Sequence, residues 1–171
     1  MSSRTATSCI SASPIETTMT AQPGLLHYED FHVGMTIDLG EYPVKAEEIV
    51  AFANEFDPHP FHLDHEAGKK SILGGLCASG WHSCAMLMRM LVDGYLSRTA
   101  GMGSNGVDEV KWLKPVFAGE TLKATMTVLA KRVSSRKPYM GILTMRADVL
   151  NAHGERKMEM TAVNLVKVRH P

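Results

Sequence analysis

The alternation of apolar and polar positions along the chain predicts one strand, then helices, then four more strands. Apolar residues alternate with polar ones over 35–44, and they follow helical spacing over 45–56 and 79–98. The second half of the chain returns to a period of two, with strands expected at 107–116, 122–131, 143–149 and 158–168. This order predicts an α+β fold, in which an antiparallel sheet wraps around one long central apolar helix.

The helix expected over 79–98 is apolar on nearly every side. One face is formed by Trp81, Cys84, Ala85, Met88, Val92 and Tyr95. Because the flanking positions are also apolar, we expect this helix to be buried nearly all round and to lie in the middle of the fold. His82, Arg89 and Asp93 interrupt the run of about 20 apolar residues that a membrane span needs, so no membrane segment is expected.

Two prolines set the end of the first predicted helix. Pro58 disfavours the helical conformation for the residue before it, so this helix should end at Asp57. Pro60 lacks the backbone donor that a continuing helix needs. We therefore expect an extended, stiff loop as far as Asp64, which then caps a short helix over 64–70.

The composition is typical of one globular domain. The chain has 171 residues, 44% of them hydrophobic, and its 18 basic residues balance 18 acidic ones. A net charge of zero argues against nucleic acid as a partner, and three cysteines without metal-finger spacing favour a reducing, cytoplasmic setting. The first twenty residues lack the apolar stretch of a secretion signal. We expect a flexible extension over 1–24 and a single domain over 25–171.

The loop after the first helix carries the strongest candidate chemistry. Its sequence FDPHPFHLDH (56–65) holds three imidazoles and two carboxylates. Asp57 and His62 can face one water molecule, and a carboxylate with an imidazole is the pair that activates water and reprotonates a product. Two other interpretations stay open: a surface loop whose polar residues cap helices, or a metal site formed by His59, His62, Asp64 and His65.

A glycine-rich segment over 74–82 leads into the central helix. Gly80 at the start of that helix leaves backbone amides without partners and lets a ligand approach closely. With the helix dipole, such amides polarise a carbonyl oxygen and stabilise an enolate that forms on it. The alternative is a plain connection in which Ser79 caps the helix.

A basic turn near position 134 is a further candidate. It carries Lys131, Arg132, Arg136 and Lys137. These residues either contact the phosphates of a nucleotide, across a subunit boundary if necessary, or form a solvated charged turn.

Together these segments resemble the MaoC-like dehydratases, which include the (R)-specific enoyl-CoA hydratases. The resemblance rests on DPHPFHLD (57–64), on ASGWH (78–82) opening the long helix, and on VKWLKPV (110–116) ahead of GETL (119–122). It extends from about residue 27 through residue 168. Two positions depart from the family pattern: His59 stands where asparagine is usual, and Ser79 stands where a histidine often precedes the glycine.

The resemblance implies a hotdog fold, a homodimer paired through its sheets, and an acyl thioester substrate on coenzyme A or acyl carrier protein. The implied reaction adds water to a trans-2-enoyl-CoA to give a 3-hydroxyacyl-CoA, or runs in reverse, with no metal and no separate cofactor. By match to the motif, Asp57 and His62 take the catalytic positions, while Gly80, with Ser79 beside it, binds the substrate carbonyl. A hotdog acyl-CoA thioesterase and a non-catalytic acyl-thioester-binding subunit are the alternatives.

Overall fold

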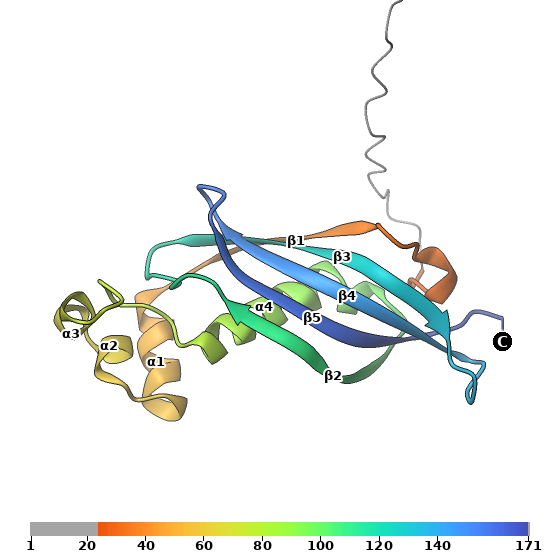
Figure 1. Cartoon of the computed structure of the whole chain (residues 1–171), viewed down its shortest axis with the longest axis horizontal. Helices are drawn as coiled ribbons and strands as arrows, with labels where there is room; N and C mark the ends of the chain where they lie inside the picture. The colour runs from red at the N-terminus through yellow and green to blue at the C-terminus, as the bar shows by residue number, and fades with distance from the viewer. Residues whose placement is uncertain (1–23, 171) are drawn as a thin grey trace, which may run out of the picture.

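Five antiparallel strands form one sheet, and one long helix runs along its inner face (Figure 1). The computed structural model describes residues 24–170. In chain order the elements are η1 (Tyr28–Asp30), β1 (Thr36–Pro43), α1 (Ala46–Phe56), α2 (Pro60–Leu63), α3 (His65–Lys70), α4 (Gly80–Gly94), η2 (Leu96–Arg98), β2 (Gly101–Trp112), β3 (Thr121–Val133), β4 (Met140–Asn151) and β5 (Arg156–Lys167). The strand order is β1-β3-β4-β5-β2. The predicted fold class, α+β with an antiparallel sheet around a central helix, is confirmed.

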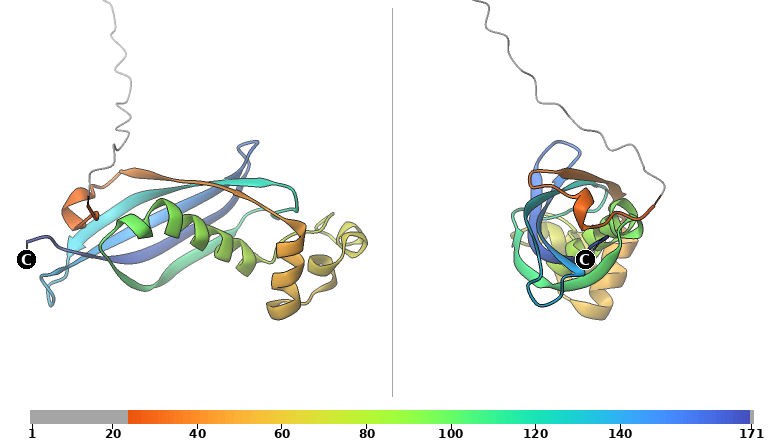
Figure 2. Two further views of the ribbon diagram at one scale, coloured as in Figure 1. Left: turned by 180° about the vertical axis from the view of Figure 1, so that it is seen from behind. Right: turned by 90° about the vertical axis from the view of Figure 1, so that its right-hand side faces the viewer.

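The core lies between α4 and the concave face of the sheet. Viewed along its length, the sheet curls around the helix (Figure 2). Successive side chains of a strand point to opposite faces, so alternate residues of β4 form the inner surface. In β4 these are the fully buried Leu143, Met145, Ala147 and Val149. They belong to one apolar cluster with Met86, Leu87 and Met90 of α4.

The prediction that α4 is buried nearly all round is wrong for a single chain. Met86 and Leu87 are buried, whereas Trp81 is 64% exposed and Met88 is 50% exposed. The sheet covers only part of the helix circumference, and the expected face with Trp81 and Met88 lies mostly outside that part. The end of α4 packs closely on β1: a Cβ at Gly94 would lie only 2.7 Å from Cα of Leu39.

The three short helices gather beyond one end of the sheet, at the first turn of α4 (Figures 1 and 2). α1 ends at Phe56 as predicted, and Asp57 is its C-cap. The loop expected to be extended up to Asp64 contains the single helical turn α2, which begins at Pro60. Proline lacks a backbone N–H, but the N–H of the first helical residue has no acceptor within the helix. A proline can therefore begin a helix, although it interrupts the interior of one. Asp64 caps α3 as predicted, accepting a hydrogen bond from Ala67 N at 2.8 Å.

Both ends of the strand predicted over 107–116 differ from the sequence-based expectation. β2 starts at Gly101, earlier than the predicted 107, and ends at Trp112. The predicted extension over 1–24 lies, apart from Gly24, outside the described residues. Within 24–170, no helix is both long enough and apolar enough to cross a bilayer.

His82 joins α4 to α1 and gives the fold a pH-dependent stability. Its ring stacks on Phe52, with centroids 4.8 Å apart, and its buried Nδ1 has no hydrogen-bond partner among the described residues. Burial lowers the pKa of His82 below its ordinary 6.5, although Glu48 acts in the opposite direction. Below about pH 6.5, therefore, the imidazole of His82 binds a proton more readily in the unfolded chain than in the folded chain.

We expect the free energy of unfolding to fall as the pH drops below 6.5, by up to about 1.4 kcal/mol at pH 5.5 from this group. His82→Phe keeps the aromatic contact but cannot take up the proton, so its stability should change less between pH 7.5 and 5.5. Urea unfolding of both proteins at the two pH values measures the difference. Equal pH dependence in the two proteins would contradict this role for His82.

Candidate active site

The structure brings Asp57 and His62 together at the first turn of α4. His62 is buried, and its Nδ1 lies 2.7 Å from the carbonyl oxygen of Cys77. Because a carbonyl oxygen only accepts hydrogen bonds, Nδ1 carries the proton. In neutral His62 the other nitrogen, Nε2, is then an acceptor, and it lies 3.6 Å from Oδ2 of Asp57.

Two acceptors at this distance can be bridged by one water molecule. The nearby hydroxyl of Ser79, and after it His59, lower the pKa of the Asp57 carboxyl, so Asp57 is ionised at neutral pH. A carboxylate oxygen and an unprotonated imidazole nitrogen cannot bond to each other directly, but one water can donate a hydrogen to each. Both lone pairs of that water then stay free for attack on a carbon atom.

The segment that leads into α4 is fixed against the rest of the fold. Ala78 N donates to the carbonyl oxygen of Val116 at 2.8 Å, and Cys77 forms a bridge with Phe117. The same segment supplies the Cys77 carbonyl that orients His62. Gly80, the first residue of α4, has a backbone amide without an acceptor inside the helix. This amide is available to polarise the oxygen of a ligand.

Ser79 does not cap α4 with its side chain, which corrects one of the two alternatives for this segment. The residue occupies the N-cap position, but its hydroxyl makes no capping hydrogen bond. Ser79 is only 2% exposed, and its Oγ forms no hydrogen bond of normal geometry with any described residue. Of the groups near Asp57, the Ser79 hydroxyl is the largest cause of the lowered pKa of the Asp57 carboxyl.

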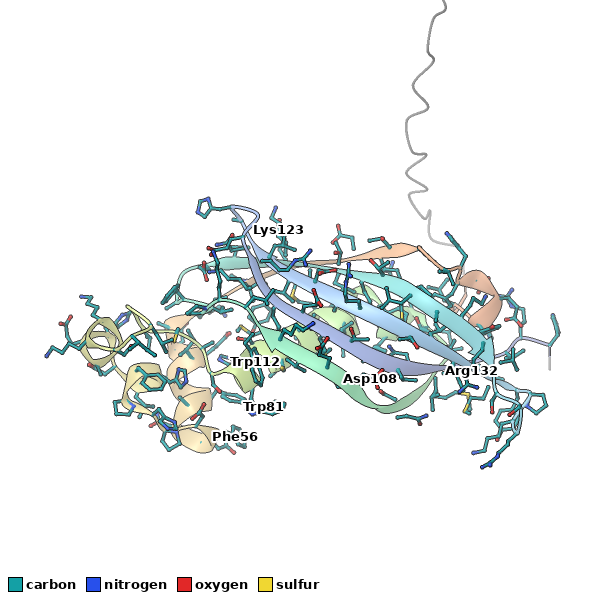
Figure 3. The ribbon with its side chains drawn as sticks, viewed as in Figure 1. Phe56, Trp81, Asp108, Trp112, Lys123 and Arg132 are labelled. Carbon is teal, nitrogen blue, oxygen red and sulfur yellow. The ribbon has the colours of Figure 1, made fainter. Side chains whose placement is uncertain are left out.

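Trp112 is a site residue that the sequence reasoning did not single out. Its Nε1–H donates to the carbonyl oxygen of Gly80 at 2.9 Å, and its ring packs on the glycine. A Cβ at position 80 would lie 2.7 Å from Cε2 of this ring. With the indole in this position, a methyl group at position 80 fits only if the ring or the start of α4 shifts. Figure 3 shows Trp81 and Trp112 at the helical end of the sheet, where their rings meet edge to face.

We expect Gly80→Ala to impair the site despite the higher helix propensity of alanine. The added methyl group must displace the Trp112 ring or the start of α4, and a shift of about 1 Å in a reacting geometry costs about 100-fold in rate. Turnover should fall about 10- to 100-fold. Trp112→Ala removes the obstacle, so the double variant should lose less than the sum of the two single losses. Strict additivity would mean that the methyl group does not act through the indole.

The metal-site alternative requires His59, His62, Asp64 and His65 to converge, and they do not. The carboxylate of Asp64 is engaged in capping α3, while Nδ1 of His62 is engaged with Cys77. Within residues 24–170, no group of three or more His, Cys, Asp or Glu side chains is arranged to hold a metal ion.

An apolar cavity of about 250 Å³ lies farther along α4, between the helix and the sheet. Met88, Leu91 and Tyr95 line it from the helix side, and Met126, Met145 and Met160 line it from the sheet. Asp57 and His62 do not line this cavity. It begins about 12 Å from Gly80, at 1.5 Å of rise per helical residue. The Asp57–His62 pair and the cavity are therefore separate features joined by one helix.

The basic turn lies far from Asp57 within one chain. Arg132, near the end of β3, and Trp112 stand at opposite ends of the sheet (Figure 3). Lys131 is engaged elsewhere, because its Nζ donates to the carbonyl oxygens of Tyr28 and Phe31 and lies 4.1 Å from the centre of the Tyr28 ring. Lys131 therefore anchors the N-terminal turn η1.

Comparison with known proteins identifies the family and the fold. The sequence pattern of the family described as "MaoC like domain" matches residues 30–148. The MaoC-like dehydratase from Rhodospirillum rubrum is similar in structure, with a TM-score of 0.76 and 42% identity over 85% of this chain and 99% of that one. The (R)-hydratase from A. caviae involved in PHA biosynthesis shares the fold, with a TM-score of 0.65 and 23% identity over 80% and 97% of the two chains. The uncharacterized protein YdeM of Bacillus subtilis is 24% identical over 139 residues, which cover 81% of this chain and 97% of YdeM.

Proposed function

Because the chain belongs to the MaoC-like domain family, we propose that it is a hydratase or dehydratase of acyl thioesters. The observation that carries this proposal is the pair of acceptors, Asp57 Oδ2 and His62 Nε2, held 3.6 Å apart beside the free amide of Gly80. The 42% identity to the MaoC-like dehydratase from Rhodospirillum rubrum supports the same reaction class.

The proposed reaction adds water across the double bond of a trans-2-enoyl thioester. The thioester carbonyl accepts a hydrogen bond from the Gly80 amide, which draws electron density away from C3. Asp57 and His62 hold the water against C3, and one of them takes its proton as the new C–O bond forms. The electron pair of the double bond moves toward the carbonyl oxygen, and the enolate collapses as C2 takes up a proton. The product is a 3-hydroxyacyl thioester, and dehydration is the reverse.

The acyl carrier is coenzyme A or acyl carrier protein, and the reaction as written needs no other cofactor. Asp57 and His62 are too close to titrate independently, so the two proton transfers are assigned to the pair.

We further propose that two copies pair through β2. This strand is an edge of the sheet, its residues are exposed along nearly its whole length, and its outer backbone groups are available for pairing. The exposed side of α4, with Trp81 and Met88, adjoins this edge and would be covered by the partner.

Incubation of the purified protein with crotonyl-CoA tests the function. Hydration removes the absorbance of the conjugated double bond without releasing a free thiol. Release of thiol would instead identify a thioesterase, and binding without any turnover would identify a non-catalytic subunit. Enoyl-CoA substrates of different chain length and branching then define the preferred acyl group.

A further inference from the structure

His59 is a histidine for which the proposed mechanism gives no role. Its Nδ1 lies 2.6 Å from Oδ1 of Asp57, on the side of the carboxylate away from His62. Asp57 is ionised and can only accept, so His59 Nδ1 donates the hydrogen bond. Such short bonds to a charged acceptor are about twice as strong as neutral ones.

This bond restrains the Asp57 carboxylate, next to the Ser79 hydroxyl, which has the larger effect on its pKa. Asp57 follows the last residue of α1, has left the helical conformation, and its side chain is 26% exposed. The 3.6 Å between its Oδ2 and His62 Nε2 is too long for a hydrogen bond. Over residues 24–170, His59 is the one group that makes a hydrogen bond of normal geometry to this carboxylate.

The imidazole of His59 is itself held in place, although 63% of the side chain is exposed. Its backbone N–H donates to the carbonyl oxygen of Asp57 at 2.7 Å, and the residue is the N-cap of α2. Pro58 and Pro60 fix the backbone on either side. The ring stacks on Phe61 with centroids 5.3 Å apart. A donor on this stiff support can orient a neighbouring side chain.

From these contacts we propose that His59 is a positioning residue for the reaction: its Nδ1–H holds Oδ1 of Asp57 and thereby turns Oδ2 toward His62 and the attacking water. The inference rests on the proposed function, because it assigns the water to Oδ2. His59 itself does not touch the substrate. Its contribution is to keep one carboxylate oxygen occupied and the other aligned.

Two substitutions separate the donor of His59 from its ring. In asparagine, Nδ2 is bonded to Cγ as Nδ1 is in histidine, so His59→Asn keeps an N–H donor near the same place without the stacked ring. His59→Phe keeps a ring against Phe61 but has no donor. We expect His59→Phe to lower kcat about 10- to 100-fold with KM within about twofold of the wild type, because it disturbs alignment and not binding. His59→Asn should retain kcat within about threefold.

The measurement is steady-state kinetics on crotonyl-CoA, with thermal unfolding of each variant as a check that it is folded. His65→Phe, in the same loop but at the exposed start of α3, serves as the matched control and should behave as the wild type. Equal kcat values for His59→Asn and His59→Phe, at whatever level, would overturn the positioning role. If that occurs while Asp57→Asn still abolishes turnover, the proposed function stands. If Asp57→Asn has no effect, the proposed function itself fails.

Discussion

Replacing Asp57 with asparagine lowers kcat about 10²- to 10⁴-fold, and replacing His62 with glutamine has an effect of the same order. In the proposed mechanism, each change removes one of the two groups that hold the water and transfer its proton. Because the two side chains act on the same molecule, the double variant should be little worse than either single one. The decrease in conjugated-enoyl absorbance of crotonyl-CoA measures all three.

Matched controls exist in the same loop. Asp64→Asn makes the same chemical change at the N-cap of α3, where asparagine caps as well as aspartate, and it should leave turnover unchanged. His65→Gln is the corresponding control for His62. Wild-type turnover in a folded Asp57→Asn or His62→Gln protein would remove the pair from the mechanism.

Replacing Lys157 with methionine lowers the free energy of unfolding by about 3 kcal/mol, at the lower end of the range for breaking a buried ion pair. Lys157 is 2% exposed, and its Nζ lies 2.8 Å from Glu120 and 2.7 Å from Glu155. Burial acts to lower the pKa of Lys157, but the two carboxylates outweigh it and raise the pKa. Without the ammonium group, the mostly buried carboxylate of Glu120 loses its ion pair, which destabilises the folded chain.

The ionic cluster of Lys157, Glu120 and Glu155 holds a segment that pairs with the candidate site. Lys157 Nζ also donates to the carbonyl oxygen of Pro115, and Glu120 accepts a hydrogen bond from the amide of Phe117. The chain between Pro115 and Phe117 is the one that pairs with Cys77 and Ala78. Loss of the Lys157 contacts should therefore loosen the segment over 77–80, which orients His62 and ends at Gly80.

Thermal or urea unfolding measures the stability loss, which corresponds to a melting temperature lower by about 6–12 °C. Lys114→Met is the matched control, because Lys114 also pairs with Glu155 but is 55% exposed. A surface pair of this kind contributes about 0–1 kcal/mol. Equal effects of the two substitutions would contradict the assignment of Lys157 as a buried ionic anchor.

The sequence predicts the strands, the central helix and the proximity of Asp57 and His62 because these depend on local pattern. Periodicity locates β3, β4 and β5, and Pro58 marks the end of α1. The role of Pro60 is predicted less well, since the same residue that blocks a helix interior can begin a new helix. The apolar positions of α4 also predict a helix that is buried nearly all round, but how much of a helix is covered depends on how far the sheet wraps around it.

Contacts between distant segments could not be predicted in this way. The carbonyl of Cys77 sets the tautomer of His62, and the indole of Trp112 fixes Gly80, but a backbone acceptor or an edge-strand tryptophan leaves no distinctive pattern in one sequence. The sequence shows His59 at a position where the family pattern has asparagine. Only its distance to Asp57 indicates what it does.

A crystal structure of the protein with butyryl-CoA tests the central claim most directly, because this saturated thioester has no double bond to hydrate. We predict that the thioester oxygen lies about 2.7–3.2 Å from the Gly80 amide nitrogen. We also predict one water that contacts both Asp57 Oδ2 and His62 Nε2 and lies against C3 of the acyl chain. A thioester bound away from the first turn of α4, or a water that reaches only one of the two side chains, would contradict the account.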